Sequence, residues 1–329
     1  MNFQTIRRWL PQGAIEQSMN NEKRGATDSV IKDLEINGFR AALIPYSSIE
    51  IIRKIFDSYP EREDTPFSIK EWFLSKQPPD IAFEPLSFLV IAYQSAEGEM
   101  RLSHKGKEVL LPIPPTYLDG SKQQRLDEVL KEAANGWNSK NGYQISKAKG
   151  ISMKLLAVLS GLGKYGRNAL CYIEGWGSSC NFDAYYTDIP CEEKAHEPVL
   201  MDLCQSCGLC TANCPNDAFG GQYIFDASRC LTLWNEHNEP MPDWLAPSVH
   251  HTAIGCMRCQ EVCPVNKAAP IIKKEPLELS EAETEALLSL PSVELPPDLV
   301  KRLLDYGLWE MFVPLAGRNI KLALEAMGV

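Results

Sequence analysis

Several features are missing from this sequence, and each absence narrows the class of protein. No apolar run comes near the roughly 20 residues that a membrane-spanning helix needs. No low-complexity tract or internal repeat interrupts the 329 residues. An export signal is not indicated, because Pro11 follows Arg7 and Arg8 where the apolar segment of a twin-arginine signal should begin. The sequence therefore predicts a cytoplasmic protein with no membrane partner, in a compartment where thiols stay reduced.

Positive charge is also scarce. The chain has 33 Lys and Arg against 43 Asp and Glu, which gives a formal net charge of -10 at pH 7. Proteins that bind nucleic acid usually carry a basic stripe along the phosphates. The charge balance therefore favours a small-molecule substrate and disfavours nucleic acid as a partner.

Cysteine, by contrast, is abundant in one segment, which holds eight of the eleven cysteines. Residues 204–215 form CQSCGLCTANCP, and residues 256–264 form CMRCQEVCP. The first spacing, C-x2-C-x2-C-x3-C-P, is that of bacterial ferredoxins, where the fourth cysteine binds the other cluster. If each block gives its last cysteine to the cluster of the other block, the chain binds two 4Fe-4S clusters. The first cluster is then bound by Cys204, Cys207, Cys210 and Cys263, and the second by Cys214, Cys230, Cys256 and Cys259. Two zinc sites are the alternative, but zinc needs neither the third cysteine of each block nor the following proline.

The rest of the chain predicts an α/β or α+β fold. Segments with helical spacing of apolar residues alternate with short apolar runs rich in branched residues. The helical spacing predicts helices at residues 29–38 and 49–60, and the apolar runs predict buried strands at residues 40–47 and 87–94. We expect an α/β domain over residues 1–200, a ferredoxin-like domain over 201–270 and a C-terminal helical brace over 271–329.

A glycine loop at residues 160–170, SGLGKYGRNAL, matches G-x-G-x-x-G through Gly161, Gly163 and Gly166. A dinucleotide fingerprint must follow a strand and open a helix, whereas residues 153–159 have helical spacing and the glycines end that helix. A nicotinamide site is therefore disfavoured here.

The order of several motifs resembles one family. SGLGKYGRNAL, WGSS at residues 176–179 and YYTDIP at residues 185–190 precede the two cysteine blocks with closely matching spacing. On these residues the chain resembles the corrinoid-dependent iron-sulfur reductases, which are the epoxyqueuosine reductases and the reductive dehalogenases. The resemblance implies a nitroreductase-like domain that holds base-off cobalamin, a ferredoxin module that feeds it electrons, and an external donor such as ferredoxin or flavodoxin. None of the five histidines lies in a D-x-H-x-x-G motif, which agrees with a cobalt that has no histidine ligand.

The same resemblance assigns the cofactor contacts to the glycine loop and the WGSS turn. Glycines would let the backbone approach a corrin, and Arg and Asn side chains would bind its amide or phosphate oxygens. The expected cobalamin-binding residues are Gly161, Gly163, Gly166, Arg167, Asn168 and Ser178. A plain helix C-cap and turn is the alternative for the loop.

The candidate proton donors are Lys147, Tyr185 and Tyr186. Counting back from Gly161, Lys147 occupies the position of the catalytic aspartate of epoxyqueuosine reductases. The alternatives are a solvated surface lysine and tyrosines that pack a sheet.

The lost aspartate and the acidic charge together favour a relative with a different substrate. Our expectation is a cobalamin-dependent reductase of a small molecule, by reductive dehalogenation or a related elimination. Two alternatives stay open: a ferredoxin-type electron carrier or corrinoid-reducing activator, and an epoxyqueuosine reductase of tRNA with a displaced proton donor.

Overall fold

The main sheet of this computed structural model has four strands. The structure describes residues 30–58, 81–118, 120–140, 143–220, 224–308 and 312–329. The strands lie in the order β1-β2-β8-β5, and each adjacent pair is antiparallel. Their bounds are β1 Arg40–Pro45, β2 Ser87–Gln94, β8 Cys180–Thr187 and β5 Ile145–Lys147. The predicted strands at 40–47 and 87–94 are thus confirmed as β1 and β2.

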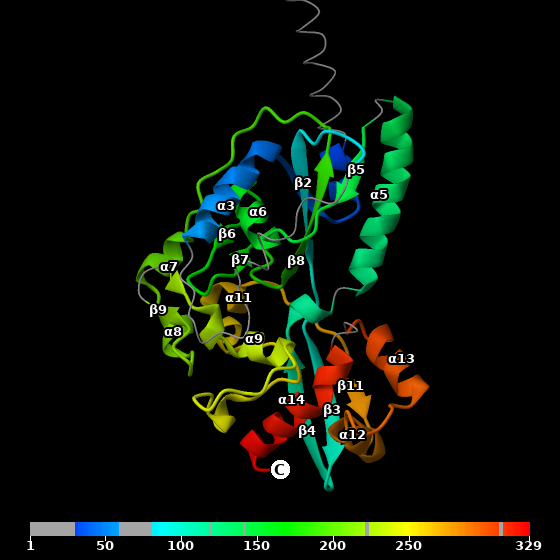
Figure 1. Cartoon of the computed structure of the whole chain (residues 1–329), viewed down its shortest axis with the longest axis vertical. Coiled ribbons are helices and arrows are strands. Elements are labelled where there is room, and N and C mark those ends of the chain that lie inside the picture. The colour runs from blue at the N-terminus through cyan, green and yellow to red at the C-terminus, as the bar shows by residue number, and fades with distance from the viewer. Residues whose placement is uncertain (1–29, 59–80, 119, 141–142, 221–223, 309–311) are drawn as a thin grey trace, which may run out of the picture.

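Helices cover both faces of this sheet (Figure 1). On one face α3 (Ile49–Asp57) and α6 (Met153–Leu159) pack over Phe88, Val90 and Tyr186. On the other face α5 (Gly120–Lys140) packs over a core that includes Leu89, Ile91 and Tyr185. Successive strand residues point to opposite faces, so a strand buried on both sides has to be apolar almost throughout. This requirement explains the near-continuous apolar run in β2.

A second sheet is built from distant parts of the chain. Strands β3 (Gly98–His104) and β4 (Lys107–Ile113) form a hairpin, and β11 (Leu277–Leu279) pairs with β3 in parallel. Lys105 and Gly106 between β3 and β4 have φ of 48° and 74°, the left-handed pair that a tight two-residue hairpin turn needs. The sheet order is therefore β11-β3-β4.

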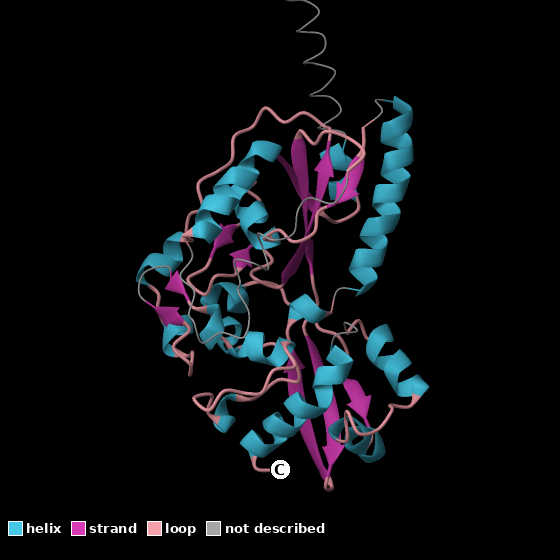
Figure 2. Ribbon diagram, in the orientation of Figure 1, coloured by secondary structure: helices cyan, strands magenta, loops and turns pink. Residues whose placement is uncertain are grey.

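Three C-terminal helices cover this second sheet, as Figure 2 shows. They are α12 (Glu281–Leu288), α13 (Pro297–Asp305) and α14 (Phe312–Met327), and they share a buried core with Met100, Leu102 and Leu111 of the hairpin. The sequence predicted helical patterns that correspond to α13 and α14, but it predicted neither α12 nor β11. The division of the chain into three domains stays a prediction.

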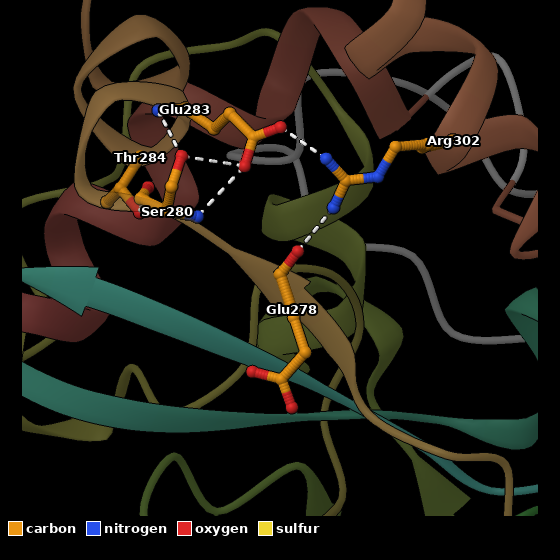
Figure 3. A network of polar contacts seen from close by, with 5 residues as sticks. All are labelled: Glu278, Ser280, Glu283, Thr284 and Arg302. Atoms are coloured by element: carbon orange, nitrogen blue, oxygen red, sulfur yellow. Dashed lines mark hydrogen bonds and ion pairs between the residues drawn. The ribbon is translucent and has the colours of Figure 1, made fainter.

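A polar network fastens α12 and α13 to β11 (Figure 3). Ser280 caps α12: its hydroxyl accepts from the Glu283 backbone N–H at 3.4 Å, and the Glu283 carboxylate accepts from the Ser280 N–H at 2.9 Å. Arg302 of α13 donates to that carboxylate and to the Glu278 carbonyl of β11. One guanidinium thus joins three elements.

The cysteine segment is a set of short elements beside α6. They are α7 (Asp202–Ser206), α8 (Leu209–Ala212), β9 (Phe219–Gly220), β10 (Ile224–Phe225), α9 (Leu231–Glu236), α10 (Arg258–Glu261) and α11 (Pro264–Ala268). Two further short strands, β6 (Lys164–Tyr165) and β7 (Cys171–Tyr172), pair with each other, and Figure 1 draws them between α6 and α11. None of the helices in the described ranges is both long and apolar enough to cross a membrane.

Candidate metal centre

One group of thiols contains cysteines from both blocks of the cysteine segment. Burial raises the pKa of the Cys204 thiol, and the neighbouring Cys263 and Cys207 add to the rise. Burial likewise raises the pKa of Cys210, with Cys204 and Cys207 as its cysteine neighbours. All four thiols line one cavity, which the glycine loop also lines. We call these four residues set one: Cys204, Cys207, Cys210 and Cys263.

A second group forms beside the first. Burial raises the pKa of Cys256 to about 12, and Cys230 and Cys214 add to the rise. The pKa of Cys259 is also raised well above its ordinary value, first by burial and then by Cys230 and Cys256. Cys210 adds the last of these contributions, so the two groups are neighbours. We call the second group set two: Cys214, Cys230, Cys256 and Cys259.

These raised pKa values describe thiols that hold their protons in the apo protein. A thiolate is the metal ligand, so binding of iron to such thiols must release protons. Within the described residues, no three His, Cys, Asp or Glu side chains lie close enough together to hold a single metal ion.

Two of the residues predicted to bind cobalamin attach the cysteine segment to the α/β part. Arg167 donates two hydrogen bonds to the Cys204 carbonyl, at 3.1 and 2.6 Å, and a third to the Gln205 carbonyl at 3.2 Å. Ser178 donates from its backbone N–H to Asn266 Oδ1 at 2.9 Å and from its hydroxyl to Gln260 Oε1 at 3.0 Å. Both cysteine blocks are thereby anchored to the α/β part.

The glycines of the loop are required by contacts inside the protein. Gly161 ends α6 with φ of 79°, a conformation that favours glycine. A Cβ on Gly163 would lie 2.6 Å from Cys171 Sγ and 2.7 Å from the Tyr172 carbonyl oxygen. A Cβ on Gly166 would lie 2.4 Å from the Tyr172 ring. The loop therefore packs closely on β7.

Replacing Gly163 with alanine should destabilise the fold by about 1–3 kcal/mol, the usual cost of overpacking. Chemical unfolding followed by far-UV circular dichroism measures this. The added Cβ collides with Cys171 Sγ, so Cys171→Ala combined with Gly163→Ala should recover part of the loss. An unchanged unfolding midpoint in Gly163→Ala would contradict the packing described here.

The three candidate proton donors differ in what surrounds them. Lys147 at the end of β5 forms an ion pair with Asp183 of β8, with 2.9 Å between Nζ and Oδ1. The lysine side chain is 40% exposed and that of the aspartate only 8%. Tyr185 and Tyr186 are buried, and burial raises the pKa of both, aided by Asp183 for Tyr185 and by Tyr46 for Tyr186. The structure brings Lys147 and Tyr185 together on one face, since Lys147 Nζ lies 6.0 Å from the Tyr185 ring centroid, and leaves Tyr186 on the other.

Sequence reasoning missed Asp183 and Tyr172. Neither residue carries a recognisable motif in the sequence. The available signal was the strand period: Asp183 and Tyr185 are two residues apart in β8 and so share a face.

Comparison with known proteins agrees with this geometry. Residues 203–266 match the family of 4Fe-4S double cluster binding domains. Two curated relatives are an epoxyqueuosine reductase of Pseudomonas aeruginosa, 34% identical over 118 residues, and one of Cyclobacterium marinum, 29% identical over 154 residues. The chain is similar to epoxyqueuosine reductases. The matched regions span 35% and 46% of this chain, and only 32% and 49% of these epoxyqueuosine reductases, so the chain matches about half or less of their length.

Solved structures extend the similarity to most of the fold. An epoxyqueuosine reductase from Bacillus subtilis aligns over 94% of this chain and 82% of its own, with a TM-score of 0.58 and 18% identity. A structure of epoxyqueuosine reductase with an epoxyqueuosine-modified tRNA-Tyr stem loop aligns over the same shares, with a TM-score of 0.60 and 18% identity. These alignments show a shared mixed α/β fold.

The comparisons correct two expectations from the sequence. The relatives at 25–36% identity are epoxyqueuosine reductases, so the expectation of a small-molecule reductase related to dehalogenases is wrong. A catabolic reductive dehalogenase aligns with a TM-score of only 0.35 and carries no argument. The exclusion of nucleic acid is wrong as well, because one epoxyqueuosine reductase of this fold is seen with a tRNA stem loop. Its physical basis was weak, since a net charge of -10 is a sum over the whole chain and does not describe any one surface.

Proposed function

We propose that the chain is an iron-sulfur reductase in which set one and set two each hold one 4Fe-4S cluster. The donor chemistry fits, because each set offers four thiols and four thiolates are what such a cluster needs. Cys263 raises the pKa of Cys204, and Cys214 raises the pKa of Cys256. These effects support the assignment of Cys263 to the cluster of the first block and of Cys214 to the cluster of the second. When bound, the clusters supply electrons one at a time at low potential. An external donor of the ferredoxin or flavodoxin type in the cytoplasm would load them.

The proposed substrate is an epoxyqueuosine-type nucleoside carried on tRNA. The observation that carries this proposal is the set of hydrogen bonds from Arg167 and Ser178 that attach the cysteine segment to the α/β part. The chain also aligns with an epoxyqueuosine reductase structure over 94% of its length. Electrons from the clusters can thus reach a site in the α/β part. An electron carrier would need no such second part, so the reductase is the better fit. The antiparallel sheet with helices on both faces also supports the description nitroreductase-like for this part, as our proposal.

Lys147 is our proposed proton donor. It is the most accessible of the three candidates, and the Asp183 carboxylate fixes the position of its ammonium group. Raised pKa values make Tyr185 and Tyr186 weaker acids, and both are buried. An ammonium group can donate a proton to an oxygen that gains negative charge as the substrate is reduced.

Four of the six residues assigned to cobalamin are already engaged in contacts inside the protein. Gly163 and Gly166 face Cys171 and Tyr172, while Arg167 and Ser178 are bonded to the cysteine segment. None of these four is left as a cradle for a macrocycle. We therefore assign reduction to the clusters and proton transfer to side chains of the α/β part, with cobalamin as an added component in turnover experiments.

Anaerobically reconstituted protein should reduce epoxyqueuosine in tRNA to queuosine when given a low-potential reductant. Nucleoside analysis of digested tRNA by mass spectrometry measures the product, with and without added cobalamin. Unmodified tRNA and protein without clusters serve as controls. Failure of protein with its full iron content to convert the substrate under either condition would refute the proposed substrate.

A further inference from the structure

The C-terminal helix α14 lies against α9 of the cysteine segment (Figure 1). Asn319 of α14 donates from Nδ2 to two backbone carbonyls of that segment, that of Asn235 at 2.9 Å and that of Ala253 at 3.0 Å. An amide NH2 has two hydrogens, so both are used. Asn235 follows Cys230 by five residues, and Ala253 precedes Cys256 by three. One side chain of α14 thus holds two stretches that each carry cysteine of set two.

The same two stretches are also hydrogen-bonded to each other. Asn235 Nδ2 donates to the Gly255 carbonyl at 2.9 Å, and the Thr252 hydroxyl donates to the same carbonyl at 2.8 Å. Gly255 has φ of 65°, a conformation that favours glycine. Asn235, Thr252 and Asn319 are each 0% exposed, so bulk water does not compete for these bonds. The end of α9 is therefore fixed against the turn that leads into Cys256.

Arg318 orients the Asn319 amide and adds a second hold on α9. Its Nε donates to Asn319 Oδ1 at 3.1 Å. Its two terminal nitrogens donate to the Trp234 and Glu239 carbonyls, both at 2.8 Å. The last carbonyls of a helix have no partner inside the helix, so the guanidinium supplies one at the end of α9. At the start of α9, Trp234 Nε1 donates to the Ser228 carbonyl at 2.7 Å, which keeps the short helix in place.

Set two has to be assembled from distant parts of the chain, since Cys230 and Cys256 are 26 positions apart. Closing such a loop costs conformational entropy. We propose that Asn319 and Arg318 are positioning residues for the second cluster, which hold α9 against the turn before Cys256 and so keep Cys230 within reach of the same cluster. This inference rests on the proposed function, because it requires that set two holds a cluster.

Asn319→Leu tests the inference, because leucine has nearly the volume of asparagine but cannot donate a hydrogen bond. In anaerobically reconstituted protein the iron content should fall from about eight to about four per chain, the content of one 4Fe-4S cluster. Electron paramagnetic resonance of the reduced protein identifies the missing cluster. The lost signal should be the one that Cys230→Ala also loses, and the signal of set one should keep its wild-type intensity.

Arg318→Met is a milder second variant, because it keeps the two bonds that Asn319 donates and removes those that orient the amide. Cluster two should form but lose its iron to a chelator about tenfold faster than in wild type, in line with the loss of one or two net hydrogen bonds. Arg318→Lys should recover part of this loss, since an ammonium group can still donate to a carbonyl.

Ile320→Ala is the matched control on the same helix. Ile320 is 0% exposed and packs in the core that α14 shares with the second sheet. Its truncation leaves a cavity but keeps every hydrogen bond of Asn319 and Arg318. This variant should unfold at a lower denaturant concentration, measured by far-UV circular dichroism, and still contain about eight irons and both signals.

The outcomes separate this inference from the proposed function. A lack of iron in wild-type protein defeats the proposed function itself. Full iron with both signals in Asn319→Leu would overturn the positioning role alone, and so would an equal loss of cluster two in Ile320→Ala, because general loosening of α14 would then be enough. If Asn319→Leu does not fold, Arg318→Met decides the question, and iron release at the wild-type rate in that variant would overturn the inference.

Discussion

Cys263→Ala is expected to remove about four of about eight irons from the reconstituted protein and to bring turnover to background. The lost cluster should be the one bound by Cys204, Cys207 and Cys210, although Cys263 lies only four residues after Cys259 of the other set. The reason is spatial: Cys263 lines the same cavity as the three cysteines of the first block. Cys214→Ala should show the reverse and remove the cluster of the second block.

Iron content and electron paramagnetic resonance of the reduced proteins distinguish the two variants. Cys191→Ala is the matched control, because this half-buried thiol lies outside both sets and its loss should leave the iron unchanged. If Cys263→Ala and Cys259→Ala lose the same spectral signal while Cys214→Ala loses the other, the exchange of cysteines between blocks is refuted and each block binds its own cluster.

Lys147→Met should lower turnover of epoxyqueuosine tRNA by about 10²–10⁴-fold, the usual contribution of general acid catalysis. Methionine keeps much of the length of the side chain but cannot donate a proton. Asp183→Asn should have a smaller effect, because the ammonium group remains and only its partner changes. Single-turnover rates with pre-reduced protein measure the step without interference from electron supply.

Removing Lys147 also leaves the Asp183 carboxylate, whose side chain is only 8% exposed, without its cation, so stability must be measured too. The double variant Lys147→Met with Asp183→Asn removes that charge and should be at least as stable as Lys147→Met, yet equally inactive. Lys149→Met, at an exposed position two residues along, should keep wild-type turnover. Near-normal rates in Lys147→Met would rule out the lysine as proton donor.

Local sequence patterns predicted the parts of the fold that local physics determines. Strand β2 and helix α6 were placed at their observed bounds, because a doubly buried strand is continuously apolar and a helix repeats its apolar face. Strand β11 was missed because it has three residues and exists only through pairing with β3, far away in the chain. The hairpin at residues 98–113 was hidden among prolines and glycines that usually mark loops.

The candidate site also has parts that local sequence patterns predict and parts that they do not. Cluster cysteines were recognisable because their spacing is fixed by the size of a cluster. Arg167 was singled out from the sequence, but its hydrogen bonds to the Cys204 and Gln205 carbonyls depend on how the loop docks on the cysteine segment, which no local pattern encodes. The substrate was misjudged because a whole-chain charge and one missing aspartate were given more weight than the order of the motifs.

The pairing of β11 with β3 also bears on how the protein is made. Arg101 and Glu278, which join these strands by an ion pair, are 177 residues apart. At about 5–20 residues per second on the ribosome, roughly 9 to 35 s separate their synthesis. During that interval one edge of the hairpin has no partner and its apolar face has no helices over it, which makes it a site for misassociation of nascent chains. Early contact with a chaperone is therefore expected at residues 98–113, before the clusters are inserted.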